Sequence, residues 1–244
     1  MKCPECGSIL IAGPVLRLCP VCSARLDPER QEHTAVSVGD RVIFGRYPQK
    51  AVASYRDAAG YDVLSSFLEA DPEPIGWRVL DIICGMAMIM TERLLDHGQY
   101  NEQRRDVTWD TCSLRKWLNT DFYELAFNTH ERSMIAEAVL HPQENEYGTD
   151  GGDPSKNRVF ILSVDEAKRY FAGDCDRKAE VTAYAQSNGA HYNEEDGAGC
   201  WWLRSPGCRN DLAAAVDIRG GIESAGQCVD SGLCCVRPVV IVAV

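Results

Sequence analysis

The spacing of the first four cysteines constrains the fold of this chain more than any other feature of the sequence. Two Cys-x₂-Cys pairs, Cys3/Cys6 and Cys19/Cys22, are separated by twelve residues. Such pairs sit in tight turns, and two of these turns place four thiolates tetrahedrally around one metal ion. The sequence therefore predicts a small zinc ribbon over residues 1–26 that holds one structural Zn²⁺. Because the protein supplies all four ligands, the predicted site has no open position for catalysis.

The composition of the whole chain is that of a globular protein with a strong acidic balance. It has 244 residues, of which 45% are hydrophobic, and a formal net charge of -11. This length allows one substantial domain behind the ribbon. A chain this acidic repels phosphate backbones, so we expect no nucleic-acid binding through bulk charge. No apolar run approaches the roughly 20 residues of a membrane helix, and no targeting segment is visible. We therefore expect a cytoplasmic protein without a membrane partner.

The chain divides by composition into the ribbon, a short linker and a main domain. Residues 27–36 are polar and are interpreted as the linker, which leaves residues 37–244 for the main domain. Within that domain, the apolar runs 77–83 and 86–90 flank Cys84-Gly85, a pattern that predicts a β-hairpin.

Helix and strand signals follow each other along the main domain. Asn128 with Glu131, and Ser163 with Glu166, form capping-box patterns that predict helices ending near residues 139 and 171. Residues 143–157 are rich in Gly, Asp and Asn and are expected to form a loop. Short strands are expected at residues 38–44, where Pro48 would end the first, and at 201–203, 213–218, 226–229 and 236–242. Strands before and after a helical region indicate an α+β domain.

A series of motifs runs through the main domain. It consists of Phe44-Gly45-Arg46-Tyr47-Pro48-Gln49, Trp77-Arg78-Val79-Leu80-Asp81, Tyr100-Asn101-Glu102, Thr108-Trp109, Leu114-Arg115-Lys116-Trp117-Leu118-Asn119, Trp201-Trp202-Leu203-Arg204-Ser205-Pro206-Gly207 and Val236-Arg237-Pro238. The series resembles an uncharacterised bacterial and phage domain family that commonly follows zinc ribbons. The closing pattern of that family resembles C-type-lectin-like domains, including the formylglycine-generating-enzyme type. The resemblance implies a C-type-lectin-like α+β fold for residues 37–244. The chain departs from the family pattern at Gly76 and Cys235.

The aromatic and arginine residues of these motifs are expected to support the fold. Trp201 and Trp202 are interpreted as core residues, because large aromatic side chains dominate burial. Arg204 and Arg237 are expected to bind backbone carbonyls or a carboxylate, with Asp81 as the candidate partner.

The stretch 208–235 alternates a regular skeleton with chemically unrelated residues. The residues expected to keep the fold are Ala213, Ala214, Val216, Gly220, Gly226 and Val229. The residues expected to be displayed and to bind a ligand are Cys208, Arg209, Asp211, Asp217, Ile218, Glu223, Gln227, Cys228, Asp230, Leu233 and Cys234. Small, polar and apolar side chains on a rigid sheet offer adaptable contacts, as in other diversified binding surfaces.

The family resemblance implies an origin for such a pattern. Similar proteins are targets of diversity-generating retroelements, which rewrite adenines in AAC codons of a terminal repeat. Rewritten AAC codons encode Cys, Arg, Asp, Ile and Leu, but they cannot encode Glu223 or Gln227. The sequence thus predicts a non-enzymatic ligand-binding protein whose surface at residues 208–235 binds an unknown ligand, which we expect to be a protein.

Two other functions stay open at this point. The formylglycine-generating type of the fold binds copper through a cysteine pair near its C-terminus, and Cys228, Cys234 and Cys235 invite that comparison. Adjacent Cys234 and Cys235 would point to opposite faces of a strand, which argues against one shared metal. Alternatively, the ribbon could act in regulation, by docking a partner or by binding nucleic acid. The remaining cysteines toward the C-terminal end are interpreted as displayed side chains. A disulfide framework is not expected, because no secretion signal is visible.

Overall fold

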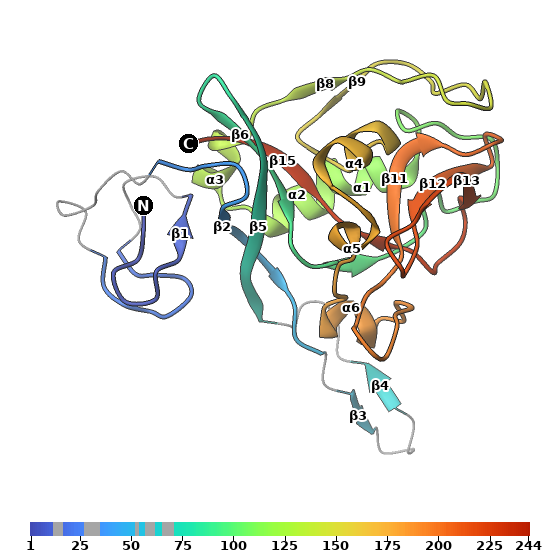
Figure 1. Ribbon diagram of the computed structural model, residues 1–244. Coiled ribbons are helices and arrows are strands. Elements are labelled where there is room, and N and C mark those ends of the chain that lie inside the picture. The colour runs from blue at the N-terminus through green and yellow to red at the C-terminus, as the bar shows by residue number, and fades with distance from the viewer. Residues whose placement is uncertain (12–16, 27–34, 52–53, 57–61, 65–70) are drawn as a thin grey trace.

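Two β-sheets form the framework of the protein, for which we analyse a computed structural model (Figure 1). The structure describes residues 1–11, 17–26, 35–51, 54–56, 62–64 and 71–244. One sheet has the strand order β1 (Ile9–Leu10), β2 (Arg41–Pro48), β5 (Pro72–Ile83), β6 (Met86–Thr91), β15 (Val239–Ala243) and β10 (Val159–Phe160). The other has the order β13 (Ile222–Cys228), β12 (Leu212–Val216), β11 (Trp201–Pro206), β14 (Cys235–Val236) and β7 (Asp96–His97).

Smaller elements surround the two sheets. Two hairpins are formed by β3 (Ser54–Arg56) with β4 (Asp62–Leu64) and by β8 (Ala138–Leu140) with β9 (Ser155–Asn157). The helices are α1 (Ser113–Trp117), a π-helical turn at Leu118–Phe122, α2 (Tyr123–Ala126), α3 (Thr129–Met134), α4 (Val164–Tyr170), α5 (Asp174–Arg177) and α6 (Ala183–Ser187). None of the described helices could cross a membrane. The protein is therefore sheet-rich with few helices, and its architecture is of the α+β type.

The expected hairpin at residues 77–90 is confirmed as β5 and β6. Cys84 and Gly85 have φ values of 52° and 76°, the left-handed pair that a two-residue hairpin turn requires. The first expected strand is shifted, because β2 runs through Pro48 instead of ending before it. Pro48 lies at the last position of the strand, where its missing N–H does not interrupt the pairing of the residues before it.

Both capping boxes are confirmed, but one helix is shorter than expected. Asn128 and Glu131 each bind the other's backbone N–H, as do Ser163 and Glu166. Helix α3 ends at Met134 instead of continuing to residue 139. The chain turns away there, because the N–H of Ala136 donates to the Ile241 carbonyl in β15 at 2.8 Å.

The chain crosses from one sheet to the other at Arg237-Pro238, so the strand expected at residues 236–242 is two strands. The guanidinium group of Arg237 is buried, and it donates to the carbonyl oxygens of Thr91 and Arg177 at 3.0 and 3.1 Å. Its guanidinium carbon also lies 5.1 Å from the centre of the Trp201 ring. Arg237 thus ties the crossing point to the neighbouring segments on both sides.

The expectation that Arg204 and Arg237 bind carbonyls or a carboxylate is confirmed, but their partner is not Asp81. Arg204 donates to the Ile161 carbonyl at 2.9 Å and to both oxygens of Glu166. Asp81 instead accepts from Arg169 and Tyr170 on α4. Trp201 and Trp202 are both fully buried, which confirms their place in the core.

Candidate metal centre and binding surface

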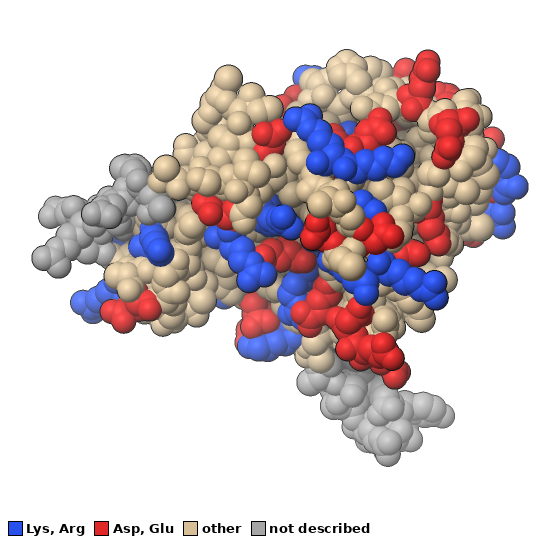
Figure 2. Space-filling view, in the orientation of Figure 1, with Lys and Arg blue, Asp and Glu red and all other residues tan. Residues whose placement is uncertain are grey.

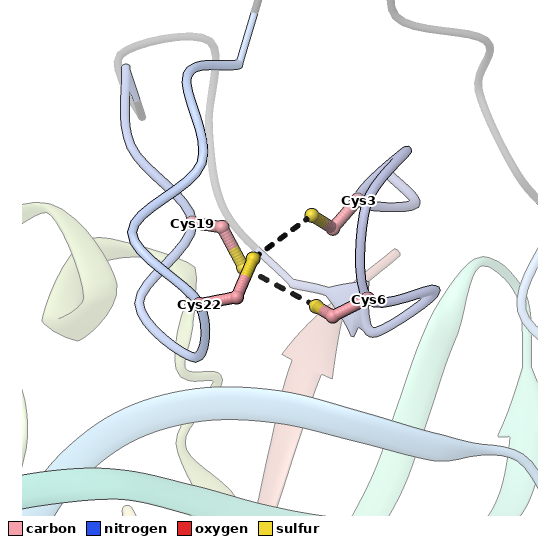
Figure 3. A group of neighbouring side chains, drawn as sticks. All are labelled: Cys3, Cys6, Cys19 and Cys22. Atoms are coloured by element: carbon pink, nitrogen blue, oxygen red, sulfur yellow. Dashed lines mark hydrogen bonds between the residues drawn. The ribbon is translucent and has the colours of Figure 1, made fainter.

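The four N-terminal cysteines lie together as the sequence predicts. Their sulfur atoms are all within 4.8 Å of one another (Figure 3). Cys3 and Cys22 are 3.6 Å apart at sulfur, and so are Cys6 and Cys19. Four sulfurs about 2.3 Å from a central zinc would be separated by about 3.8 Å, so this arrangement fits tetrahedral Zn²⁺. These four residues could hold one ion, which makes them the candidate metal centre.

Two matching turns position the sulfurs. The N–H of Gly7 donates to the Cys3 carbonyl at 3.0 Å, and the N–H of Ser23 donates to the Cys19 carbonyl at 2.9 Å. Gly7 and Ser23 occupy equivalent positions, with φ values of 73° and 59°. Hydrogen bonds with the hydroxyl and backbone of Ser8 lower the pKa of Cys6 to about 6. These hydrogen bonds favour the thiolate of Cys6, the form that binds metal.

The ribbon is joined to the main domain by strand pairing. Strand β1 pairs in parallel with β2 through Ile9–Val42 and Leu10–Ile43, and the N–H of Ile11 donates to the Ile43 carbonyl at 3.0 Å. Leu10 packs with Cys3 and Cys19 in the ribbon's own small core, whereas Ile11 belongs to the main core. The ribbon thus covers the edge of β2. Residues 27–34 of the expected linker lie outside the described residues.

Most of the skeleton residues of the 208–235 stretch, which are expected to keep the fold, are buried. The buried skeleton residues are Ala213, Ala214, Val216, Gly220 and Val229. Gly226 is half-buried, has a φ of +89°, and would place a Cβ 2.8 Å from the Ala213 carbonyl oxygen. A side chain cannot fit at that position without displacing the backbone of β12.

The expected ligand-binding residues lie mostly at the surface, but they form separate groups. Cys208, Arg209 and Leu233 are exposed, and the half-buried residues are Asp211, Asp217, Ile218, Glu223, Gln227, Cys228 and Asp230. Strand β12 pairs with β13 from Leu212–Cys228 at one end to Val216–Ile222 at the other. The residues around Arg209 and Cys228 therefore lie at one end of this strand pair, and those around Asp217 lie at the other.

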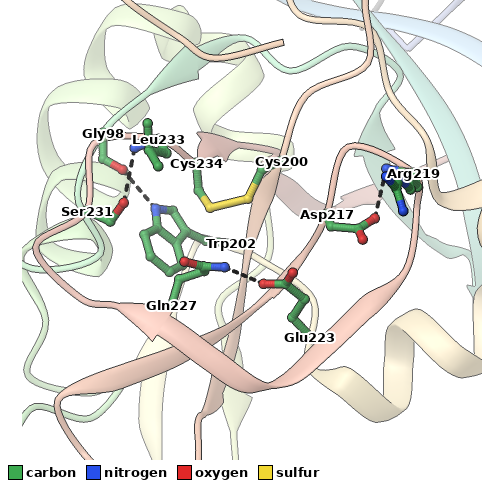
Figure 4. Close-up of a disulfide and its surroundings, with 10 residues drawn as sticks. All are labelled: Gly98, Cys200, Trp202, Asp217, Arg219, Glu223, Gln227, Ser231, Leu233 and Cys234. Carbon is green, nitrogen blue, oxygen red and sulfur yellow. Dashed lines mark hydrogen bonds between the residues drawn. A yellow bond between two sulfur atoms is a disulfide. The ribbon is translucent and has the colours of Figure 1, made fainter. Parts of the chain in front are cut away.

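Some of these side chains also have a structural role. Asp217 accepts from the N–H groups of Arg219 and Gly221 at 2.8 Å each, which holds the turn between β12 and β13. On β13, the Gln227 amide donates to the Glu223 carboxylate, on the side of the sheet where Trp202 lies (Figure 4). At the opposite end, the hydrogen bond from Arg209 lowers the pKa of Asp211, and Arg104 binds the same carboxylate.

Cys234 requires a correction, because it is not a displayed residue. Its side chain is buried and forms a disulfide with Cys200 (Figure 4). Cys235 is buried as well, and burial raises its pKa to about 12, so its thiol stays protonated. The thiols on this surface are therefore those of Cys208 and Cys228.

The loop between β8 and β9 extends the surface, a contact that the sequence alone does not predict. Asn145 donates to the Gly207 carbonyl at 3.0 Å, the Tyr147 hydroxyl lies 3.2 Å from that of Ser224, and Asn210 donates to the Asp150 carbonyl at 2.7 Å. The Gly, Asp and Asn content of this loop indicates a turn-rich segment. It does not indicate which distant segment the loop contacts.

Sequence comparison identifies the family of the main domain. Residues 84–244, more than half of the chain, match the family described as Domain of unknown function (DUF6273). The protein belongs to this family. The matching region begins at the turn between β5 and β6 and includes the whole five-stranded sheet. No curated protein and no solved structure matches the chain.

Proposed function

We propose that the protein is a non-enzymatic ligand-binding protein with a C-type-lectin-like main domain, and that its β12–β13 surface at residues 208–235 binds a protein ligand. The observation that carries this proposal is the division of burial between the two kinds of residue: Ala213, Ala214, Val216 and Val229 are buried, whereas every expected ligand-binding residue except Cys234 is exposed or half-buried. Such a surface can change its side chains without changing its backbone. This property suits a binding surface better than an active site.

The same division supports a diversified surface. We further propose that the protein is the variable target of a diversity-generating retroelement, because rewritten AAC codons can encode the Cys, Arg, Asp, Ile and Leu residues at displayed positions. Glu223 and Gln227 lie outside this code, and on β13 they bind each other. They would be fixed residues of the surface in this proposal. A reverse transcriptase gene and a near-identical template repeat beside this gene are the expected observations, and their absence would contradict it.

A display experiment tests the binding proposal directly. One library of the full chain diversifies the eight displayed positions that remain after Cys234, Glu223 and Gln227 are set aside. A matched library diversifies eight exposed positions elsewhere, including Lys116 and Lys168. Both are selected against purified lysozyme and serum albumin. We expect binders with a Kd of about 1 μM or better from the first library and none from the second. Equal yields from both libraries, or loss of folding in the first, would contradict the proposal.

The alternative functions have less support. Cys228 on β13 and Cys235 on β14 are separated by β12 and β11, which corresponds to roughly 14 Å at ordinary strand spacing. The cysteine set that suggested a copper oxidase therefore does not converge. Acidic and basic side chains are interspersed over the visible face in Figure 2, which favours a solvated surface over a nucleic-acid interface. For the ribbon, we propose support of β2 in place of docking to a partner.

A further inference from the structure

A pocket of about 250 Å³ lies at the edge of the five-stranded sheet, outside the β12–β13 surface. Strand β7 supplies Asp96 and His97 on one side, and helix α1 supplies Leu114 and Trp117 on the other. Glu102 lies at the pocket as well. The pocket therefore combines two carboxylates with an apolar wall and an indole ring.

The two carboxylates have no cationic partner within the described part of the chain. Asp96 accepts from the Tyr47 hydroxyl at 2.6 Å and from the backbone N–H of His97 at 2.8 Å. No described Lys or Arg forms an ion pair with Asp96 or Glu102, whereas Asp81, Glu166 and Asp211 each bind an arginine. Burial raises the pKa of Asp96, because its charged form is poorly solvated there. A cation in the pocket would offset that cost.

His97 leaves one polar atom of the pocket lining without a partner. The Asn188 carbonyl can only accept, so the His97 Nε2 that contacts it donates a proton. The other ring nitrogen, Nδ1, is buried without a partner among the described residues. The acceptors at the pocket are the carboxylates of Asp96 and Glu102, and they call for a donor-rich ligand.

The apolar wall fits the stem of a long basic side chain. Leu114 is buried and Trp117 is half-buried, and the Trp117 ring is held by Phe122 at 5.5 Å between ring centres. Lys and Arg bury their methylene stems along such surfaces, and an indole face attracts their charged heads. The lining is therefore complementary to a basic side chain along its whole length.

The pocket also adjoins the displayed residues at the end of the 208–235 stretch. Gln99 at its rim donates to the Asp230 carbonyl at 2.7 Å, and the N–H of Gly98 donates to the Cys234 carbonyl at 3.2 Å. Leu233, in the same loop, is 56% exposed. A protein that covers Asp230 and Leu233 would bring its own side chains to the mouth of the pocket.

We propose that this pocket is an anchor site that takes a Lys or Arg side chain of the protein ligand. The inference that the side chain comes from that ligand rests on the proposed function, but the affinity of the pocket for the cation does not. Asp96 and Glu102 bind the charged head, and Trp117 and Leu114 contact the stem. The displayed residues would vary around this fixed anchor, as buried anchors are surrounded by adaptable contacts in other interfaces.

The test uses N-acetyl-arginine amide as the probe and its uncharged analogue N-acetyl-citrulline amide as the control. Binding to the full zinc-loaded chain is followed by the NMR signals of the Trp117 indole, identified with Trp117→Phe, and of the Gly98 and Gln99 amides. We expect these signals to shift saturably with the arginine probe, with a Kd of about 1–10 mM, and not with the citrulline probe. Asp96→Asn and Glu102→Gln should each weaken binding about tenfold.

Glu124→Gln on α2 is the matched control, because it removes one exposed charge away from the pocket. Equal shifts with both probes, equal weakening by Glu124→Gln, or no saturation at about 50 mM probe would overturn the proposal. Glu102 is exposed, so the Glu102→Gln result does not depend on whether Asp96→Asn folds. Because the probe needs no protein ligand, its result is independent of the library selection that tests the binding surface.

Discussion

The two ends of the chain use cysteine in opposite ways. In the ribbon, four thiols from two local turns converge within 4.8 Å. Behind the binding surface, one disulfide joins Cys200 to Cys234 across 34 positions of sequence. Cys3 and Cys19 of the ribbon pack in a small core of their own, whereas Cys234 belongs to the large core. The ribbon site requires reduced cysteines, and the disulfide requires oxidised ones.

The largest effect is expected from removing the metal from the ribbon. Cys22→Ser should abolish zinc binding and unfold residues 1–26, because structural zinc contributes about 10 kcal/mol or more to such units. The readout is hydrogen exchange at the Ile11 amide, which donates to the Ile43 carbonyl of β2. Its protection should be lost, and the bound zinc should fall from one ion per chain to none.

Cys175→Ser is the control for this experiment, since Cys175 is an exposed free cysteine on α5. It should keep both the zinc and the protection of Ile11. If the Ile11 amide stays protected in metal-free Cys22→Ser, the ribbon holds to β2 without its metal, and the contrast between the two ends of the chain weakens.

A smaller effect is expected from the disulfide. Cys200→Ala with Cys234→Ala should lower the free energy of unfolding by about 2–4 kcal/mol. A disulfide that closes a loop of this length reduces the conformational entropy of the unfolded chain by about that amount. Urea unfolding measures the change, with Cys208→Ala on the exposed surface as the control. A thiol titration of the denatured, unreduced chain provides the second check. If Cys200 and Cys234 both react as free thiols, the disulfide is absent and the comparison fails.

The separation of the interacting residues along the sequence decides which features of the two ends could be predicted. The zinc site could be predicted because each Cys-x₂-Cys turn is local, and so could the β5–β6 turn and the capping boxes of α3 and α4. The Cys200–Cys234 bond and the contact of the 143–157 loop with the surface could not. They depend on how β11, β12 and β14 pair in the sheet. This pairing joins segments that are far apart in the sequence, so no motif of fixed spacing indicates it. For the same reason Cys234 was expected at the surface, since alternation along a chain does not reveal a distant partner.

Within the binding surface, skeleton and displayed positions should respond differently to substitution. Gly226→Ala should destabilise the protein by about 1–3 kcal/mol, because the residue has a φ of +89° and its Cβ would meet the Ala213 carbonyl oxygen at 2.8 Å. The neighbouring change Ala225→Ser, at an exposed position of the same strand, should stay within about 0.5 kcal/mol. Thermal unfolding of both variants measures the contrast. Equal losses would show that β13 does not separate the two kinds of position.

The smallest effect is expected at the second turn of the ribbon. Ser23 has a φ of 59°, a left-handed conformation that costs a residue with a Cβ roughly 1–2 kcal/mol, and the equivalent position of the first turn is Gly7. Ser23→Gly removes this strain but adds entropy to the unfolded chain, which offsets about 0.5–1 kcal/mol. We therefore expect a net gain of about 0.5 kcal/mol, seen as a modest rise in zinc affinity in a chelator competition. Gly7→Ser should lower the affinity by a similar amount. If both changes lower it, the two turns are not equivalent, and Ser23 makes a contribution that its backbone conformation does not explain.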